Sequence, residues 1–348
     1  MEHVAVYELH GGDGDGADIT FLFNGKVMSV SIFPTNGPST KSTLHLGPGR
    51  PLQDHLVDVI SEAITCKNHN EYEKLVDEVF GVILEAGRPL FSSLGSITQQ
   101  SQSLHELLFP EIIYFRLQAP AMYATILPID PSEANSIIAS DPAFTDNWDE
   151  KLKIRRELPC FTPDEMTVTK VLLRGFNSVT AAVRVHGRDL FCKVVARPSG
   201  LCGTEEGREL EYLGEISKAF QYPDTIQVPQ FLGYVHHKET QQILGFLQEW
   251  VHGSRLSNIN ITTRNRGKWM AQISQTINRL HEHGLFWGNG KPGNVLIDDK
   301  DDIWLIGCGG GFMYEHNQGR LEIIERDQKA CTEIAEFLNG GNGTTLSG

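Results

Sequence analysis

The sequence predicts an α+β fold, and two observations lead to this prediction. Runs rich in β-branched and aromatic residues cluster at 19–33 and 166–195, with turn residues between the runs. Segments with apolar residues at the i, i+3, i+4, i+7 spacing lie between and after these runs, and that spacing is typical of amphipathic helices. The chain has 348 residues, which is enough for two or three packed units.

Residues 1–118 predict a small N-terminal α+β domain. Its clearest strand signal is "ITFLFNGKVMSVSIF" at 19–33, in which two β-rich runs flank Asn24-Gly25. This dipeptide suits a two-residue hairpin turn because both residues tolerate a positive φ. "PEIIYFRL" at 110–117 predicts a further strand of the same domain.

Two amphipathic helices are expected between these strands. "PLQDHLVDVISEAITC" at 51–66 and "EYEKLVDEVFGVILEAG" at 71–87 both carry the helical apolar spacing. Gly87, followed by Pro89, predicts the end of the second helix, because glycine and proline commonly terminate helices. Residues 92–104, rich in Ser and Gln, predict a loop.

The segment 119–163 predicts a linker, because it is rich in proline and has few long periodic runs. At the other end of the chain, residues 341–348 ("GNGTTLSG") predict a flexible tail. Between them the pattern changes to closely spaced strands and helices. Three strands are expected in 166–195, with turns near Gly175 and at His186-Gly187. The later elements are expected as a helix at 205–220, strands at 228–237 and 242–253, and helices at 262–284 and 321–338.

The composition excludes several classes of protein. The net charge is −14 and the pI is about 5.4, which argues against a nucleic-acid partner because phosphate backbones need a basic surface. No apolar run approaches the roughly 18 residues of a membrane span, and no signal peptide is evident. The six cysteines form no C-x-x-C pair, which favours reduced thiols. We therefore expect a cytoplasmic protein with neither a nucleic-acid nor a membrane partner.

Five motifs in the second half occur in a characteristic order. Lys193 lies in "LFCKVV", and Glu209 follows 16 residues later in "GRELEYL". "GFLQEWVHG" at 245–253, "WGNGKPGN" at 287–294 and "GCG" at 307–309 come next. In order and spacing this series resembles a protein-kinase domain, in particular the kinase-like proteins common in filamentous fungi. The resemblance also extends to a leading domain of about 150 residues.

The resemblance implies a two-lobed domain with an N-lobe at 164–250 and a C-lobe at 251–340. We expect this C-lobe to be shortened, because about 40 residues with one clear helix follow Gly307. By the same resemblance, Lys193 would hold a nucleotide's phosphates and Glu209 would pair with that lysine. Glu211 is a neighbouring candidate, but it points about 200° around the helix from Glu209.

The departures from the family's pattern concern its chemistry. Asn289 replaces the aspartate that accepts the substrate proton, and an amide oxygen is essentially non-basic near pH 7. Gly307 replaces the aspartate that holds Mg²⁺, and glycine supplies no side-chain oxygen. Gly175 alone remains of the glycine-rich loop, and Trp287 replaces the histidine of the catalytic loop. We therefore expect no metal, no cofactor and no conventional kinase activity.

The residues expected at the site follow from the positions that match the family's motifs. Lys193 and Asn289 are the expected catalytic residues, and they would act as hydrogen-bond donors. The expected ligand-binding residues are Gly175, Glu209, Glu249, Trp287, Lys291, Asn294, Gly307 and Cys308. For Lys193 and Glu209 a purely structural ion pair is an equally good interpretation, and for Trp287 and Cys308 a place in the core is the plainer interpretation.

Three function classes stay open at this point. The first is a kinase fold repurposed to bind a small organic substrate between its lobes and to catalyse a nucleotide-independent cyclisation, isomerisation or pericyclic step of fungal secondary metabolism. The second is a non-catalytic pseudokinase that acts as a binding or scaffold protein. The third is a weak, atypical kinase. The retained lysine and amides favour the first two, and the sequence leaves the oligomeric state open.

Overall fold

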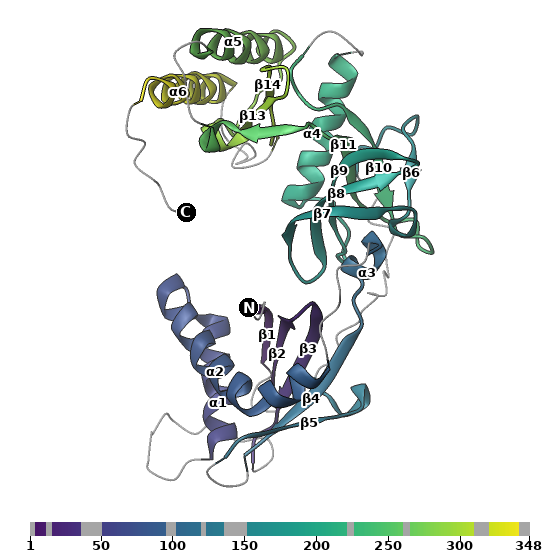
Figure 1. Ribbon diagram of the computed structural model, residues 1–348, viewed down its shortest axis with the longest axis vertical. Helices are drawn as coiled ribbons and strands as arrows, with labels where there is room; N and C mark the ends of the chain where they lie inside the picture. The colour runs from purple at the N-terminus through teal and green to yellow at the C-terminus, as the bar shows by residue number, and fades with distance from the viewer. Residues whose placement is uncertain are drawn as a thin grey trace. The chain divides into compact units, whose positions relative to one another are not determined.

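The computed structural model describes residues 4–11, 16–35, 51–94, 102–119, 123–135, 152–220, 226–259, 265–309 and 320–340. These residues form a mixed α+β structure, in agreement with the α+β part of the predicted fold (Figure 1). The chain divides into two compact units, residues 1–142 and residues 143–348. The predicted tail at 341–348 lies outside the described residues.

The first unit contains a five-stranded sheet in the order β1-β2-β3-β4-β5. The strands are β1 (Val4–Gly11), β2 (Ala17–Phe23), β3 (Lys26–Ile32), β4 (Ile112–Gln118) and β5 (Thr125–Pro128). Strands β3 and β4 run parallel, and the other neighbours are antiparallel. The predicted hairpin turn is confirmed, because Asn24 (φ 49°) and Gly25 (φ 88°) both have positive φ and join β2 to β3.

Strand β5 shows that the first unit continues beyond residue 118. It pairs with β4 from Thr125, opposite Gln118, to Pro128, opposite Phe115. The sequence places these residues in the linker 119–163 because the stretch is rich in proline. Pro128 ends the strand at the edge of the sheet, where the missing N–H is tolerated.

Helices α1 (Leu52–Thr65) and α2 (His69–Ser93) lie together against one face of this sheet (Figure 1). The predicted end of α2 at Gly87 is wrong, because the helix continues through Pro89 to Ser93. Burial of Phe91 explains the continuation: its ring packs against Phe21 and Phe115 at centroid distances of 5.5 and 5.3 Å. This packing offsets the backbone hydrogen bond that Pro89 cannot donate.

A short helix, α3 (Leu104–Leu108), lies at the end of the segment predicted as a loop. Ser103 and Glu106 form a reciprocal capping box at its start. Residues 95–101 of that predicted loop lie outside the described part of the chain.

The second unit begins with a six-stranded sheet in the order β6-β10-β11-β9-β8-β7. Its strands are β6 (Cys160–Phe161), β7 (Thr167–Arg174), β8 (Ser178–Val185), β9 (Arg188–Val195), β10 (Phe231–His236) and β11 (Ile243–Glu249). The three predicted strands of 166–195 are confirmed, and so is the turn at His186 and Gly187, which have φ values of 48° and 79°. Helix α4 (Glu205–Ala219) follows β9, as predicted.

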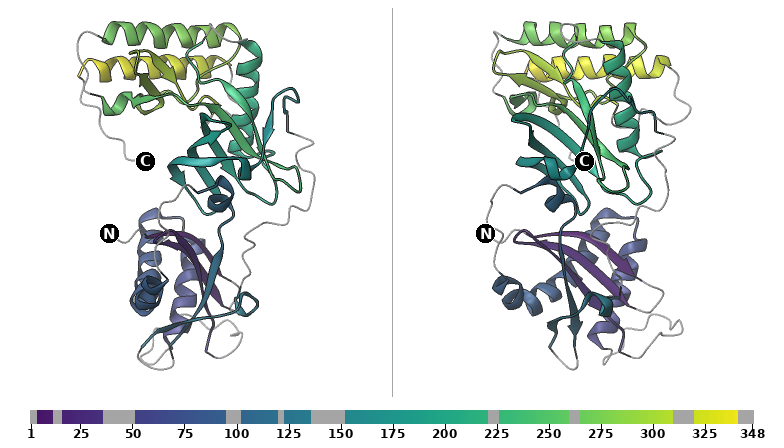
Figure 2. Two further views of the ribbon diagram at one scale, coloured as in Figure 1. Left: turned by 45° about the vertical axis from the view of Figure 1, so that its right-hand side comes forward. Right: turned by 90° about the vertical axis from the view of Figure 1, so that its right-hand side faces the viewer.

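The remainder of the second unit holds a three-stranded sheet and two long helices. The elements are β12 (Gly253–Arg255), β13 (Val295–Asp298), β14 (Ile303–Leu305), α5 (Arg266–Glu282) and α6 (Arg320–Leu338). Helices α5 and α6 lie side by side (Figure 2). The second unit also has short 3₁₀ turns at Pro163–Glu165, Leu256–Asn258 and Pro292–Asn294, and the first unit has one at Pro131–Glu133.

One hydrophobic core runs through the described part of the second unit. It joins α4 and the six-stranded sheet to the three-stranded sheet and its helices. Representative members are Leu210, Phe246, Ile273, Val295 and Ile334, each at most 1% exposed. Because one core is shared, side chains from both sheets are held in a defined relation to one another. Across the described residues of the whole chain, no helix is long and apolar enough to cross a lipid bilayer.

Candidate functional site

Lys193 and Glu209 form an ion pair between β9 and α4. Lys193 Nζ lies 2.5 Å from Glu209 Oε2, and the two side chains are 29% and 10% exposed. The pairing that the resemblance implies is therefore present. The neighbouring candidate, Glu211, instead accepts a hydrogen bond from the backbone N–H of Lys153 at 3.0 Å. Burial raises the pKa of the Glu209 carboxyl, and the Lys193 cation opposes that rise.

Two asparagines of the loop 287–294 lie close to Gly307. Asn294 Nδ2 donates to the carbonyl oxygen of Asn289 at 2.8 Å. Gly307 has φ 71°, and a Cβ at this position would lie 3.3 Å from Asn289 Nδ2 and 3.4 Å from Asn294 Nδ2. Asn289 and Gly307, the positions at which the sequence lacks the family's acids, are therefore neighbours in space.

Helix α4 connects this loop to the ion pair. The Tyr212 hydroxyl donates to the carbonyl oxygen of Phe286 at 2.7 Å and also bonds the backbone N–H of the same residue. A Cβ on Gly309 would lie 2.7 Å from the Tyr212 ring, so the chain after Gly307 passes directly against α4. Since Tyr212 follows Glu209 by three residues, one helix surface positions both the ion pair and the loop.

Asp327 of α6 holds the beginning of the loop, and the sequence analysis missed this residue. Its fully buried carboxylate accepts hydrogen bonds from the backbone N–H groups of Trp287 at 2.9 Å and Gly288 at 2.8 Å. His281 Nε2 lies 2.9 Å from the same carboxylate. A signal was present: Asp327 lies on the apolar stripe of α6, four residues after Ile323. An acid on a buried stripe needs polar partners inside the protein.

Trp287 and Cys308 lie in the core, which is the plainer interpretation that the sequence offered for both residues. Trp287 is fully buried, and its indole nitrogen donates to the carbonyl oxygen of Ile306 at 3.0 Å. Cys308 is 1% exposed, and burial raises the pKa of its thiol far above the ordinary value, with further contributions from Asp327 and Glu209. Cys308 is therefore a protonated, inert thiol at neutral pH.

Three more residues expected at the site lie apart from these groups or at its margin. Glu249, at the end of β11, lines a separate pocket beside the second half of α4. Lys291 is exposed, and Gly175 lies in the turn between β7 and β8, where its backbone N–H donates to the carbonyl oxygen of Ser178 at 2.9 Å. No described contact joins any of the three to Lys193 or Asn289.

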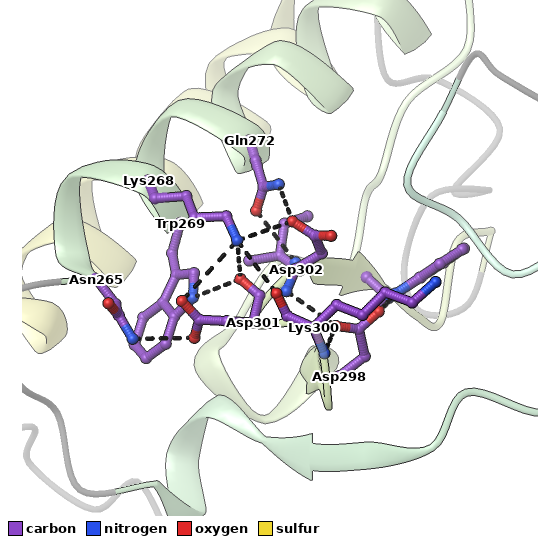
Figure 3. Close-up of polar contacts among 10 residues, drawn as sticks. Asn265, Lys268, Trp269, Gln272, Asp298, Lys300, Asp301 and Asp302 are labelled. Atoms are coloured by element: carbon purple, nitrogen blue, oxygen red, sulfur yellow. Dashed lines mark hydrogen bonds and ion pairs between the residues drawn. The ribbon is translucent and has the colours of Figure 1, made fainter.

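The acidic turn between β13 and β14 has a structural role (Figure 3). Asp298 Oδ1 accepts from the backbone N–H groups of Lys300 and Asp302, each at 2.9 Å, and Asp298 Oδ2 accepts from the indole of Trp304 at 3.0 Å. Lys268 of α5 pairs with Asp302 at 3.0 Å. Asp298 therefore orders the turn itself, and Asp302 ties the hairpin to α5.

Within the described ranges, no group of three or more His, Cys, Asp or Glu side chains gathers in a way that could hold a metal ion. No protein-family model matches the chain. A search of curated proteins likewise found no significant match.

Proposed function

We propose that the second unit is a kinase-like, two-lobed domain that does not carry out metal-dependent phosphoryl transfer. Its cleft instead binds a small organic molecule beside Lys193 and Asn289. The bound molecule would undergo a nucleotide-independent rearrangement, such as a cyclisation, an isomerisation or a pericyclic step. Secondary metabolism of filamentous fungi is the setting that the sequence resemblance favours.

The chemistry of the neighbouring groups at 289, 294 and 307 is the main support for this proposal. Asn289 and Asn294 present amides, and Gly307 presents no side chain, so this cluster offers hydrogen bonds without a carboxylate. A basic proton acceptor for a substrate hydroxyl and a carboxylate ligand for Mg²⁺ are both missing from it. Rate acceleration would then rest on shape and on preorganised hydrogen-bond donors.

Binding without catalysis is a second candidate, and the ion pair favours it. Lys193 Nζ is already engaged by Glu209 at 2.5 Å, so the ammonium is a less available hydrogen-bond donor than that of an unpaired lysine. Cys308 is protonated and buried, so it is no nucleophile. A protein of this kind would recognise its ligand and present the complex to a partner.

Thermal unfolding of the full chain with ATP tests the first half of the proposal. We expect no rise in melting temperature with ATP and Mg²⁺ together beyond the change with either alone, and no radiolabel transfer from γ-labelled ATP to the protein or to a peptide pool. The Asn289→Asp/Gly307→Asp double variant is the matched comparison, because it restores both carboxylates. A rise that requires both ATP and Mg²⁺ in the unmodified chain, accompanied by label transfer, would overturn the proposal.

A panel of small carboxylic acids and dicarbonyl compounds tests the second half. Compounds that bind should perturb the NMR signals of Asn289, Asn294 and Gly307, and they should bind at least about tenfold more weakly to the Lys193→Met variant. Product analysis by mass spectrometry then separates the two candidates. A converted compound supports the enzyme, and a bound but unchanged compound supports the binding protein. Binding that is unaffected by Lys193→Met would contradict both.

A further inference from the structure

A pocket of about 390 Å³ lies beside the second half of α4, and it belongs entirely to the second unit. Its size falls within the range of roughly 300–1,000 Å³ that is usual for small-molecule sites. Its apolar lining comes from several elements: α4, the chain entering β10, and β14. Leu213, Ile216, Phe220, Phe231 and Trp304 are among these lining residues. Such a surface suits a ligand with an apolar body.

Opposite charges are set into this apolar lining. Arg155 comes from the segment before β6, and Glu249 comes from the end of β11. Ser217 and Gln230 add a hydroxyl and an amide. A few convergent polar groups in a largely apolar pocket are the usual means by which a protein orients a small ligand.

Arg155 is held in place while its charge stays available. Its backbone N–H donates to the Tyr234 hydroxyl at 2.7 Å, and its Nη1 donates to Ser217 Oγ at 2.8 Å. Its Nε pairs with Glu157 at 2.7 Å, but the Glu157 side chain is 62% exposed. Water screens such a pair strongly, and the described contacts leave Nη2 of the guanidinium for a ligand.

Glu249 is anchored in a comparable way. Its backbone N–H donates to the carbonyl oxygen of Gln230 at 2.9 Å, and its Oε2 lies 3.5 Å from the backbone nitrogen of Gln230. The long second contact leaves most of the acceptor capacity of the half-buried carboxylate unused.

We propose that this pocket, which we call the α4 pocket, binds a small organic acid with an apolar body and a hydrogen-bond donor at its far end. The carboxylate of the ligand pairs with Arg155, the donor reaches Glu249, and the apolar body packs against Leu213 and Phe220. A ligand with only a carboxylate would leave Glu249 without a partner, and a ligand with only a donor would leave Arg155 without one. Full affinity therefore requires both the carboxylate and the donor on the ligand. This site is separate from Lys193 and Asn289 and does not depend on the function proposed for them.

Isothermal titration of the full chain with 3-(4-hydroxyphenyl)propionate tests the proposal. This probe has a carboxylate, an aromatic body and a distal hydroxyl. We expect saturable binding at one site per chain. 3-Phenylpropionate lacks the donor and 4-ethylphenol lacks the acid, so each should bind at least about tenfold more weakly. No saturable binding of the probe, or equal binding of either comparator, would overturn the proposal.

Matched variants locate the binding. Arg155→Met and Glu249→Gln should each weaken the probe by about tenfold or more. Arg156→Met and Glu239→Gln change exposed residues outside the pocket lining, so they should leave the affinity unchanged. Arg155→Gln also removes the charge but keeps a polar side chain, so it gives the same test if the Met variant does not fold. Equal losses in the control variants, or unchanged affinity in the pocket variants, would show that the probe binds elsewhere and would refute the assignment.

Discussion

Lys193 Nζ lies 2.5 Å from Glu209 Oε2, in an ion pair whose carboxylate side chain is only 10% exposed. Such a pair ties β9 to α4, and α4 in turn contacts the loop 287–294 through Tyr212. A buried pair contributes little net stability when both partners are present, but it strongly penalises the loss of one partner. The pair therefore gives α4 a defined position whether or not a ligand contacts it.

The first prediction concerns the pH dependence of stability. Burial raises the pKa of Glu209 above its usual 4.5, against the opposing effect of Lys193. Between pH 4.5 and the raised value, the folded protein retains a proton that the unfolded chain has lost, so the unfolding free energy falls as pH rises through that window. Glu209→Gln removes this titration, and we expect a flatter profile of unfolding free energy against pH just above 4.5.

Urea unfolding at a series of pH values measures this effect. Glu215→Gln is the matched control, because Glu215 is an exposed residue of the same helix and should keep the slope of the unmodified protein. A Glu209→Gln profile parallel to that of the unmodified protein would show that Glu209 has an ordinary pKa in the folded state.

The second prediction concerns Asp327. Replacing it with Asn keeps the size of the side chain but turns one acceptor into a donor, which then faces the backbone N–H of Trp287 or Gly288. We expect a loss of about 3 kcal/mol in unfolding free energy, the usual penalty for a buried group left without its partner. Denaturant unfolding measures it, with Glu325→Gln on the exposed face of α6 as the control. A loss no larger than that of the control would contradict the anchoring role of Asp327.

The third prediction compares two glycines of α2. A Cβ on Gly87 would lie 2.2 Å from the Phe91 ring, which is 1% exposed and surrounded by other aromatic rings. Gly87→Ala should therefore destabilise the protein by about 1–3 kcal/mol through overpacking.

Gly81 is the matched control on the same helix. A Cβ there meets nothing within 4 Å, so Gly81→Ala should gain about 0.5–1 kcal/mol from improved helix propensity. Thermal unfolding of the two variants should shift the melting temperature in opposite directions. Shifts of the same sign would show that Phe91 does not hold Gly87 as tightly as the contact distance indicates.

The fourth prediction concerns the acidic turn. Asp298 accepts two backbone hydrogen bonds and the indole N–H of Trp304, whereas the adjacent Asp299 is exposed and has no described contact. Asp298→Ala should cost about 2 kcal/mol, and Asp299→Ala should stay within about 0.5 kcal/mol of the unmodified protein. Urea unfolding measures both values, and equal values would contradict the structural role assigned to Asp298.

Local patterns predicted much of the fold. The Asn24-Gly25 turn was predictable because positive φ at two successive residues strongly restricts residue type. The Lys193–Glu209 pair was predictable because spacing within a known motif order places a strand lysine opposite one helix position. By contrast, the continuation of α2 through Pro89 depends on the burial of Phe91 among residues of β2 and β4. Local helix propensity cannot predict it, because those residues are distant in the sequence.

In the candidate site, too, some features were predictable from the sequence and others depend on tertiary contacts. The sequence left Trp287 open between a ligand contact and a place in the core, and the structure shows its indole buried and donating to the Ile306 carbonyl oxygen. Asp327 lies 39 residues from Gly288 in sequence, and only the packing of α6 against α5 brings the two together. Glu249 belongs to a different pocket because β11 ends beside the chain that enters β10.

The sequence by itself determined which functional groups this protein has, including an amide at 289, no side chain at 307 and a lysine at 193. These are covalent facts, and no folding changes them. Only the tertiary structure decided which groups meet: that Asn289, Asn294 and Gly307 are neighbours, that Asp327 anchors their loop, and that Arg155 and Glu249 share an apolar pocket. The reason is physical, since contacts between distant residues depend on how whole helices and sheets bury their apolar faces, and that is a property of the assembled core.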